Sequence, residues 1–144
     1  MQGRQCRLFI YGSLLEGETD HPLLEGAERL GAARTEPRYH LFDLGAYAAM
    51  VPDGTTSVCG EIYLAPLETR AHIDVKRQVP ILFERALIQL MDGESAEAYL
   101  MSAEKVRGRR RLHHGDWRKR FLSNVPRAAP GPFVRWARGR FSNS

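Results

Sequence analysis

The sequence contains few cysteines and no apolar stretch long enough to span a membrane. Only two cysteines, Cys6 and Cys59, occur among its 144 residues, and they do not form a CxxC pair. This number permits one disulfide bond but favours two free thiols in a reducing compartment. Residues 1–7 also lack the apolar core of a signal peptide. These absences predict a cytoplasmic protein with no membrane partner.

Several motifs that identify large enzyme classes are missing as well. The sequence has no GxSxG nucleophile elbow, no Walker loop and no dinucleotide-binding fingerprint. His113 and His114 are adjacent, so their side chains diverge, and the other histidines have no carboxylate or thiol at a metal-ligand spacing. Neither a metal ion nor another cofactor is therefore expected.

The charges are distributed unevenly along a chain of ordinary globular composition. Hydrophobic residues make up 43% of the sequence, and its length fits one domain with a substantial core. Residues 105–144 carry twelve lysines and arginines against one acid, whereas residues 1–104 carry nine basic and sixteen acidic side chains. We divide the chain into a domain over residues 1–122 and a basic tail with prolines and aromatics over residues 123–144.

This asymmetry allows two interpretations. Either the basic end folds back on the acidic body, or it acts as an interaction module that binds a separate acidic partner. The first interpretation accounts for both halves of the asymmetry, and we favour it. Aromatic residues between the arginines are compatible with nucleic-acid binding, but no DNA- or RNA-binding signature accompanies them, so nucleic acid is the less favoured partner.

Apolar patterns and turn residues predict six or seven strands and one or two short helices. Residues 66–77 carry a rough helical face, and Asp92-Gly93 predicts a hairpin between the last two strands. Strands are expected over residues 8–10, 27–35, 38–44, 58–64, 83–90 and 96–101. This content favours an α+β fold with a barrel-like sheet over a parallel doubly wound one.

Two smaller features carry specific expectations about side chains. Asp20 stands where it could cap a single helical turn over residues 20–24. A second turn, over residues 116–121, is expected to pack both Trp117 and Phe121 against the domain.

The first apolar run leads directly into a turn of small residues. Leu8-Phe9-Ile10 is followed by Tyr11-Gly12-Ser13-Leu14, and Gly12 can leave the strand at backbone angles that other residues avoid. Such a turn can aim backbone N–H groups into a pocket. Taken alone, however, these residues favour an ordinary exit turn of a core strand.

An ordered series of motifs resembles the γ-glutamylcyclotransferase-like family. Residues 8–14 are similar to its Y-G-[ST]-L signature, and the resemblance extends over residues 6–121. The further matching segments, in order, are His21 with Leu23-Leu24, Gly31 to Thr35, Tyr39 to Tyr47, Gly60-Glu61-Ile62-Tyr63 and Gly115-Asp116-Trp117-Arg118.

The resemblance implies a fold and a reaction. The fold is a small mixed β-barrel with short flanking helices. In the reaction, of transferase or lyase type, the α-amine of a γ-glutamyl compound attacks its own γ-carbonyl, which releases 5-oxoproline and an amine. A single glutamate in an L-D-x-x-E-G context acts as general acid and base. The substrate-binding residues implied here are Tyr11, Gly12, Ser13, Leu14 and Tyr47.

The sequence departs from the family pattern at the catalytic glutamate. Ile73-Asp74 matches the family's Leu-Asp, and Val79-Pro80 with residues 82–85 matches the segment beyond the glutamate. Together they place Arg77 at the glutamate position and Gln78 at the following glycine. Arginine keeps its proton at physiological pH, so it cannot act as the base.

Three interpretations of this departure are open. Arg77 could make the pocket basic, so that it binds a carboxylate or phosphate but no longer cyclises its ligand. Another carboxylate could replace the base, for which Glu84, Asp74 and Glu61 are nearest in sequence and Glu84 is the least constrained candidate. Alternatively, Arg77 could point into solvent beside a vestigial cavity.

Overall fold

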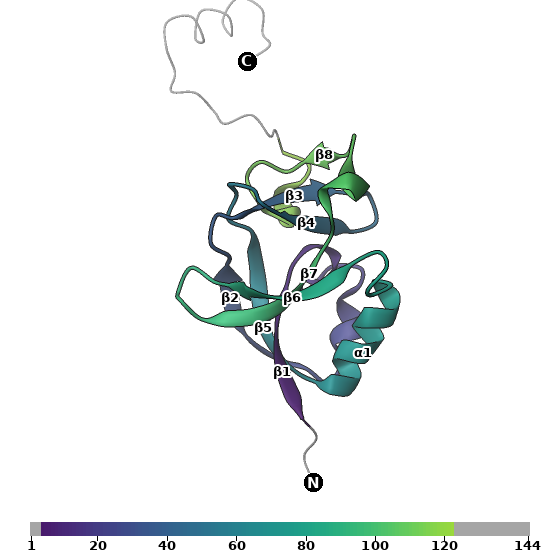
Figure 1. Cartoon of the computed structure of the whole chain (residues 1–144). Coiled ribbons are helices and arrows are strands. Elements are labelled where there is room, and N and C mark those ends of the chain that lie inside the picture. The colour runs from purple at the N-terminus through teal and green to yellow at the C-terminus, as the bar shows by residue number, and fades with distance from the viewer. Residues whose placement is uncertain (1–3, 123–144) are drawn as a thin grey trace, which may run out of the picture.

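The chain begins with a buried strand that lies within a curled mixed sheet (Figure 1). The computed structural model describes residues 4–122. Its eight strands are β1 (Gln5–Ile10), β2 (Glu28–Arg34), β3 (Tyr39–Asp43), β4 (Ala48–Pro52), β5 (Cys59–Pro66), β6 (Glu84–Gln89), β7 (Ser95–Leu100) and β8 (Arg110–Arg111). They follow the order β2-β5-β1-β7-β4-β3-β8, with β6 paired to β7.

The sheet curls until β2, at one end of this order, approaches β6. A bridge between Thr35, just after β2, and Leu90, just after β6, joins these two strands. The twist of paired strands drives this curling, and closing a sheet on itself protects strand edges from solvent. The predicted α+β fold with a barrel-like sheet is therefore confirmed.

Strand β1 is the apolar centre of the domain. Its last three residues, Leu8, Phe9 and Ile10, are fully buried, as their uninterrupted apolar run predicts. The strand pairs with β5 in antiparallel orientation and with β7 in parallel orientation. Any loop that leaves β1 thus starts from a rigid position.

Helix α1 (Leu67–Lys76) confirms the predicted helix and lies along one side of the sheet (Figure 1). Pro66 precedes it, where the missing N–H of proline costs nothing. Ile73 is fully buried in the core, and the Thr69 hydroxyl donates a hydrogen bond to the carbonyl of Glu25. The helix ends at Arg77, and Gln78 follows in a left-handed conformation with φ of 53°.

The structure corrects two side-chain expectations. Asp20 precedes the 3-10 turn η2 (His21–Leu24) but makes no capping hydrogen bond, because its carboxylate is bound elsewhere. The turn η4 (Trp117–Lys119) buries Trp117, whereas Phe121 is 85% exposed. Phe121 lies beyond the end of η4, so it does not share the buried face of that turn. Cys6 and Cys59 are free thiols.

Basic side chains of residues 105–122 pair with acidic side chains of the preceding part of the domain. Ion pairs join Arg110 to Asp43 in β3 and Arg120 to Glu18. The described residues 105–122 thus fold back on acidic positions. The predicted tail, residues 123–144, lies outside the described residues, and its predicted acidic or nucleic-acid partner stays a prediction. Within residues 4–122, none of the helices is long and apolar enough to cross a membrane.

Candidate functional site

The turn after β1 is shaped by a glycine that cannot be replaced without strain. Tyr11 is extended, and Gly12 then adopts φ of 70° as the first residue of the 3-10 turn η1 (Gly12–Leu14). A Cβ atom on Gly12 would lie 2.9 Å from the Cβ of Ala48. The positive φ and this close contact both require glycine. Ser13 and Leu14 are consequently held in buried positions directly beside β4.

Tyr11 anchors this turn through its hydroxyl group. The hydroxyl donates a hydrogen bond to the carbonyl of Tyr99 and accepts one from the N–H of Met50, at 3.0 Å. Burial raises the pKa of Tyr11 well above its ordinary value, so the hydroxyl keeps its proton. The side chain that the family resemblance assigns to substrate therefore ties β1 to β4 and β7.

Arg77 faces the turn after β1. Its side chain is only 4% exposed, and Nη2 donates hydrogen bonds to Ser13 Oγ at 2.9 Å and to Asp20 Oδ2 at 3.1 Å. The guanidinium also lies over the rings of Tyr47 and Phe83, 4.9 and 5.9 Å from their centroids. The interpretation in which Arg77 points into solvent is wrong.

One terminal nitrogen of the Arg77 guanidinium lacks a hydrogen-bond partner among the described residues. Arg77 Nη1 is buried and has no hydrogen-bond partner among residues 4–122. A buried donor without a partner costs about 1–3 kcal/mol, and more when the group is charged. Such an atom is a candidate contact for a ligand oxygen.

Asp20 is the residue that sequence reasoning did not assign to the site. Its Oδ2 accepts a hydrogen bond from Ser13 Oγ at 2.6 Å, and its N–H donates to the Ser13 carbonyl at 2.8 Å. Ser13, Asp20 and Arg77 form what we call the Arg77 cluster. The signal available in the sequence was a carboxylate seven residues after Ser13, but the same residue type also caps helical turns.

A hollow of about 350 Å³ lies beside the Arg77 cluster. Asp20 lines it, and so does Tyr47, whose ring contacts Arg77. Two cations, Lys76 and Arg120, also border it. We call this space the loop hollow, and its lining residues are Glu18, Thr19, Asp20, Gly45, Ala46, Tyr47, Lys76, Trp117 and Arg120.

Of the predicted substrate-binding residues, Tyr47 lines the loop hollow, whereas Tyr11, Gly12, Ser13 and Leu14 are buried and are not among its lining residues. Glu84 lies on another element. Glu84 is exposed at the start of β6, opposite Leu100, and its side chain has no hydrogen bond or ion pair to another described residue. Asp74 is fully engaged, because Arg85 Nε contacts both of its oxygens at 3.0 and 3.1 Å and the Tyr99 hydroxyl donates to it at 2.6 Å. No group of three or more His, Cys, Asp or Glu side chains within residues 4–122 is placed to hold a metal ion.

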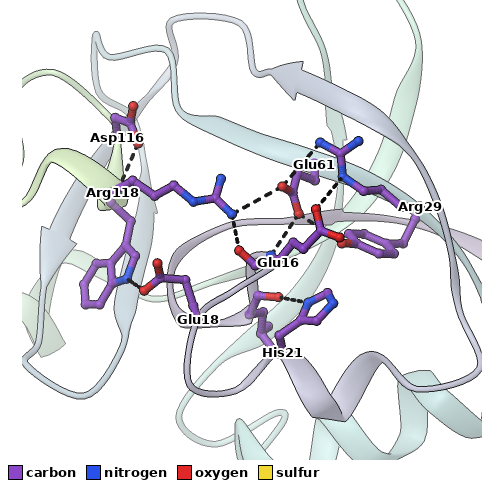
Figure 2. Close-up of polar contacts among 10 residues, drawn as sticks. Glu16, Glu18, His21, Arg29, Glu61, Asp116 and Arg118 are labelled. Atoms are coloured by element: carbon purple, nitrogen blue, oxygen red, sulfur yellow. Dashed lines mark hydrogen bonds and ion pairs between the residues drawn. The ribbon is translucent and has the colours of Figure 1, made fainter.

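Glu61 on β5 is the centre of a second polar cluster, next to the loop that follows η1 (Figure 2). Its Oε1 accepts hydrogen bonds from the N–H of Glu16, at 3.2 Å, and from the Tyr63 hydroxyl, at 3.0 Å. Its Oε2 lies 3.4 Å from both Arg29 Nη2 and Arg118 Nη2. We call this group the Glu61 cluster.

These contacts determine the ionisation of Glu61. Burial by itself would raise the pKa of Glu61, but the donated hydrogen bonds and the two arginines outweigh it. The pKa is therefore lowered below its ordinary value of 4.5, and Glu61 is a carboxylate at neutral pH. Through the N–H of Glu16, this carboxylate stabilises the segment between η1 and Asp20.

Comparison with known proteins supports the family resemblance. Residues 8–119 match the family model described as gamma-glutamyl cyclotransferase, AIG2-like. The "Putative gamma-glutamylcyclotransferase" of Vibrio cholerae is 38% identical over 116 residues, which cover 81% of this chain and 98% of that protein. Gamma-glutamylaminecyclotransferase A of Danio rerio is 30% identical over 108 residues, covering 66% of this chain and 67% of that protein.

A solved structure shares the fold. The crystal structure of a protein specific to uropathogenic Escherichia coli matches with a TM-score of 0.72 at 25% identity, covering 82% of this chain and 96% of that one. The family model spans nearly all of the described residues, from β1 to η4. The chain therefore belongs to the gamma-glutamyl cyclotransferase, AIG2-like family.

Proposed function

We propose that this protein binds a γ-glutamyl compound, or a similar small molecule with a carboxylate, in the loop hollow beside Ser13. We further propose that the residue at the family's glutamate position is not the acid–base group of any reaction that this protein catalyses. The observation that carries the proposal is the buried guanidinium of Arg77, which faces Ser13 and whose Nη1 has no hydrogen-bond partner among the residues that the structure describes.

The backbone after α1 supports placing Arg77 at the glutamate position. The family pattern has a glycine after the glutamate, and here Gln78 occupies that place with φ of 53°. Glycine adopts a positive φ without strain, whereas other residues do so rarely. A turn that favours glycine is thus retained although the residue has changed, which agrees with the register derived from Ile73-Asp74.

Two carboxylates, Glu18 and Asp20, and two cations, Lys76 and Arg120, border the loop hollow. Glu18 is paired with Arg120 and Asp20 with Arg77, so Lys76 is the lining charge without an ion pair to another described residue, which favours an anionic ligand. A guanidinium binds a carboxylate through two parallel hydrogen bonds, and only Nη2 of Arg77 is engaged. A carboxylate of the ligand would satisfy Nη1.

The named activities of the relatives indicate the class of compound. One relative is named for gamma-glutamyl substrates in general and the other for gamma-glutamylamines. The family resemblance implies that such compounds are cleaved by cyclisation, which forms 5-oxoproline. A γ-glutamyl dipeptide carries two carboxylates and is therefore the best first probe for a cavity bordered by cations.

Isothermal titration with γ-glutamylalanine tests the proposal, with 5-oxoproline in the recovered solution quantified by chromatography. Wild-type protein is expected to bind, and Arg77→Met to bind about tenfold or more weakly because a charge-assisted hydrogen bond is lost. Glu84→Gln, which changes an exposed carboxylate outside the cluster, is the matched control and keeps wild-type affinity. Equal affinity of wild type and Arg77→Met would contradict the proposal.

A further inference from the structure

We infer that Asp20 is the acid–base residue of this protein and takes over the role that glutamate has at the position of Arg77. The inference rests on the proposed function, because it requires a γ-glutamyl compound in the loop hollow. It adds a specific residue and a specific proton transfer to that proposal.

The two oxygens of Asp20 have different surroundings. Oδ2 is fixed by Ser13 Oγ at 2.6 Å and by Arg77 Nη2 at 3.1 Å. Oδ1 takes part in no hydrogen bond with residues 4–122, and Asp20 lines the loop hollow with a side chain that is 19% exposed. One oxygen therefore orients the carboxylate while the other keeps a free lone pair, which is the arrangement that a general base needs.

The position of this carboxylate also fits the role. Arg77 extends from the family's glutamate position, and its Nη2 touches Asp20. A negative carboxylate thus lies within one hydrogen bond of the side chain that replaces the glutamate. Its backbone N–H is bound to the Ser13 carbonyl, so the carboxylate is held to the predicted substrate loop at two points.

Other carboxylates near the loop are less suited to proton transfer. Both oxygens of Glu61 are occupied, and both oxygens of Asp74 contact Arg85. Glu18 also borders the loop hollow and, within residues 4–122, has partners on Oε1 alone, which accepts a hydrogen bond from Trp117 Nε1 at 3.1 Å and lies 3.7 Å from Arg120. Unlike Asp20, however, it has no hydrogen bond to Ser13 or Arg77.

The proposed step balances without a further reactant. Asp20 takes a proton from the α-ammonium of the ligand, and the free amine attacks the γ-carbonyl carbon. The new ring C–N bond forms as the carbonyl electron pair moves to oxygen. Asp20 then returns the proton to the departing nitrogen, the carbonyl re-forms and the original C–N bond breaks. The attacking nitrogen loses its second proton to the released amine, so the products are 5-oxoproline and an ammonium ion.

The test compares Asp20→Asn with wild type, using γ-glutamylalanine as the probe. Asparagine keeps an oxygen that can accept from Ser13 and Arg77 but cannot carry a proton at neutral pH. We expect binding by titration within about threefold of wild type, and 5-oxoproline formation slower by about 10²–10⁴-fold. The acid limb of the kcat–pH profile, present in wild type, disappears in the variant.

Asp20→Glu separates a catalytic from a purely structural role. It restores a carboxylate, so it is expected to form 5-oxoproline at least about tenfold faster than Asp20→Asn. Equal rates for the two variants, or an Asp20→Asn rate within threefold of wild type, would overturn the inference. Wild type that binds γ-glutamylalanine but forms no 5-oxoproline would overturn it as well and leave the proposed function standing. If wild type did not bind γ-glutamylalanine, both the proposed function and the inference about Asp20 would be wrong.

Discussion

Two carboxylates stabilise the first loop, Asp20 through Ser13 of η1 and Glu61 through the N–H of Glu16, and the protein holds them in different ways. Glu61 is 4% exposed, and both of its oxygens are occupied by hydrogen bonds and arginines. Asp20 is 19% exposed, and only one of its oxygens has partners within residues 4–122. Both carboxylates form an ion pair with at least one arginine, so ion pairing does not distinguish them.

The two carboxylates differ in whether an oxygen lone pair remains free for a ligand. A fully satisfied buried carboxylate has no lone pair for a ligand, and its removal leaves charged donors without a counter-ion. A carboxylate with one free oxygen beside a cavity can still exchange a proton. We therefore assign a structural role to the Glu61 cluster and propose a chemical role for the Arg77 cluster.

The largest effect is expected from Glu61→Gln. This change keeps the volume but removes the charge between Arg29 and Arg118, and turns one acceptor into an N–H donor that faces other donors. The free energy of unfolding, measured with urea at pH 7, should fall by about 3 kcal/mol.

Glu16→Gln is the matched control for this prediction. Glu16 also pairs with Arg29, at 3.8 Å, but its side chain is exposed. An exposed ion pair contributes little, so the change should stay below about 0.5 kcal/mol. If Glu61→Gln were as mild as Glu16→Gln, the structural role of the Glu61 cluster would be wrong.

The stability difference between wild type and Glu61→Gln should depend on pH in one direction. The pKa of Glu61 is lower in the folded protein than its ordinary value of 4.5. The ionised group therefore stabilises the fold above about pH 4.5, and this contribution is lost as the pH falls through the folded-state value. Urea unfolding of both proteins at pH 7, 5, 4 and 3 measures it. A difference that grows toward acid would contradict the assignment.

A smaller effect on stability is expected in the Arg77 cluster. Arg77→Met leaves the Asp20 carboxylate without its cation and should lower the free energy of unfolding by about 2 kcal/mol. In an Asp20→Asn background the same substitution should cost about 1 kcal/mol less, because the charge it would leave unpaired is already gone. The four proteins form a double-mutant cycle, and purely additive losses would show that the pair is not coupled.

The smallest effect is expected from Glu84→Gln. Glu84 is exposed and its side chain has no hydrogen bond or ion pair to another described residue, so the free energy of unfolding should change by less than about 0.5 kcal/mol. Because it lies outside the Arg77 cluster, 5-oxoproline formation should stay within about twofold of wild type. A large loss of turnover would instead support the sequence-based prediction of Glu84 as substitute base and count against Asp20.

Local sequence patterns predicted the elements well. The apolar run ending at Ile10, the Asp92-Gly93 hairpin and the helix before Arg77 all depend on residues close together in the chain. Strand β4 (Ala48–Pro52) was harder to predict, because its residues are buried almost throughout and show no alternation. Phe121 was wrongly expected to be buried, since a single aromatic at a turn carries no periodic signal.

The site was predictable only in part. The ordered motifs identified the turn after β1, and they predict that an arginine replaces the family's glutamate, because both positions stand in recognisable sequence contexts. Asp20 was assigned to a helical turn, because an aspartate before such a turn usually caps it. Its actual partner Arg77 lies 57 residues further along the chain.

By itself, the sequence determined the family, the order of the strands along the chain and the glycine-dependent turn at Gly12, and it predicts that Arg77 stands at the family's glutamate position. These depend on residue identity and short spacings. Only the tertiary structure decided that Arg77 is buried against Ser13, that Asp20 joins it and that Glu61 is fully occupied. The physical reason is that each of these contacts forms between segments brought together by the curled sheet and α1, and no local pattern records which side chains will meet there.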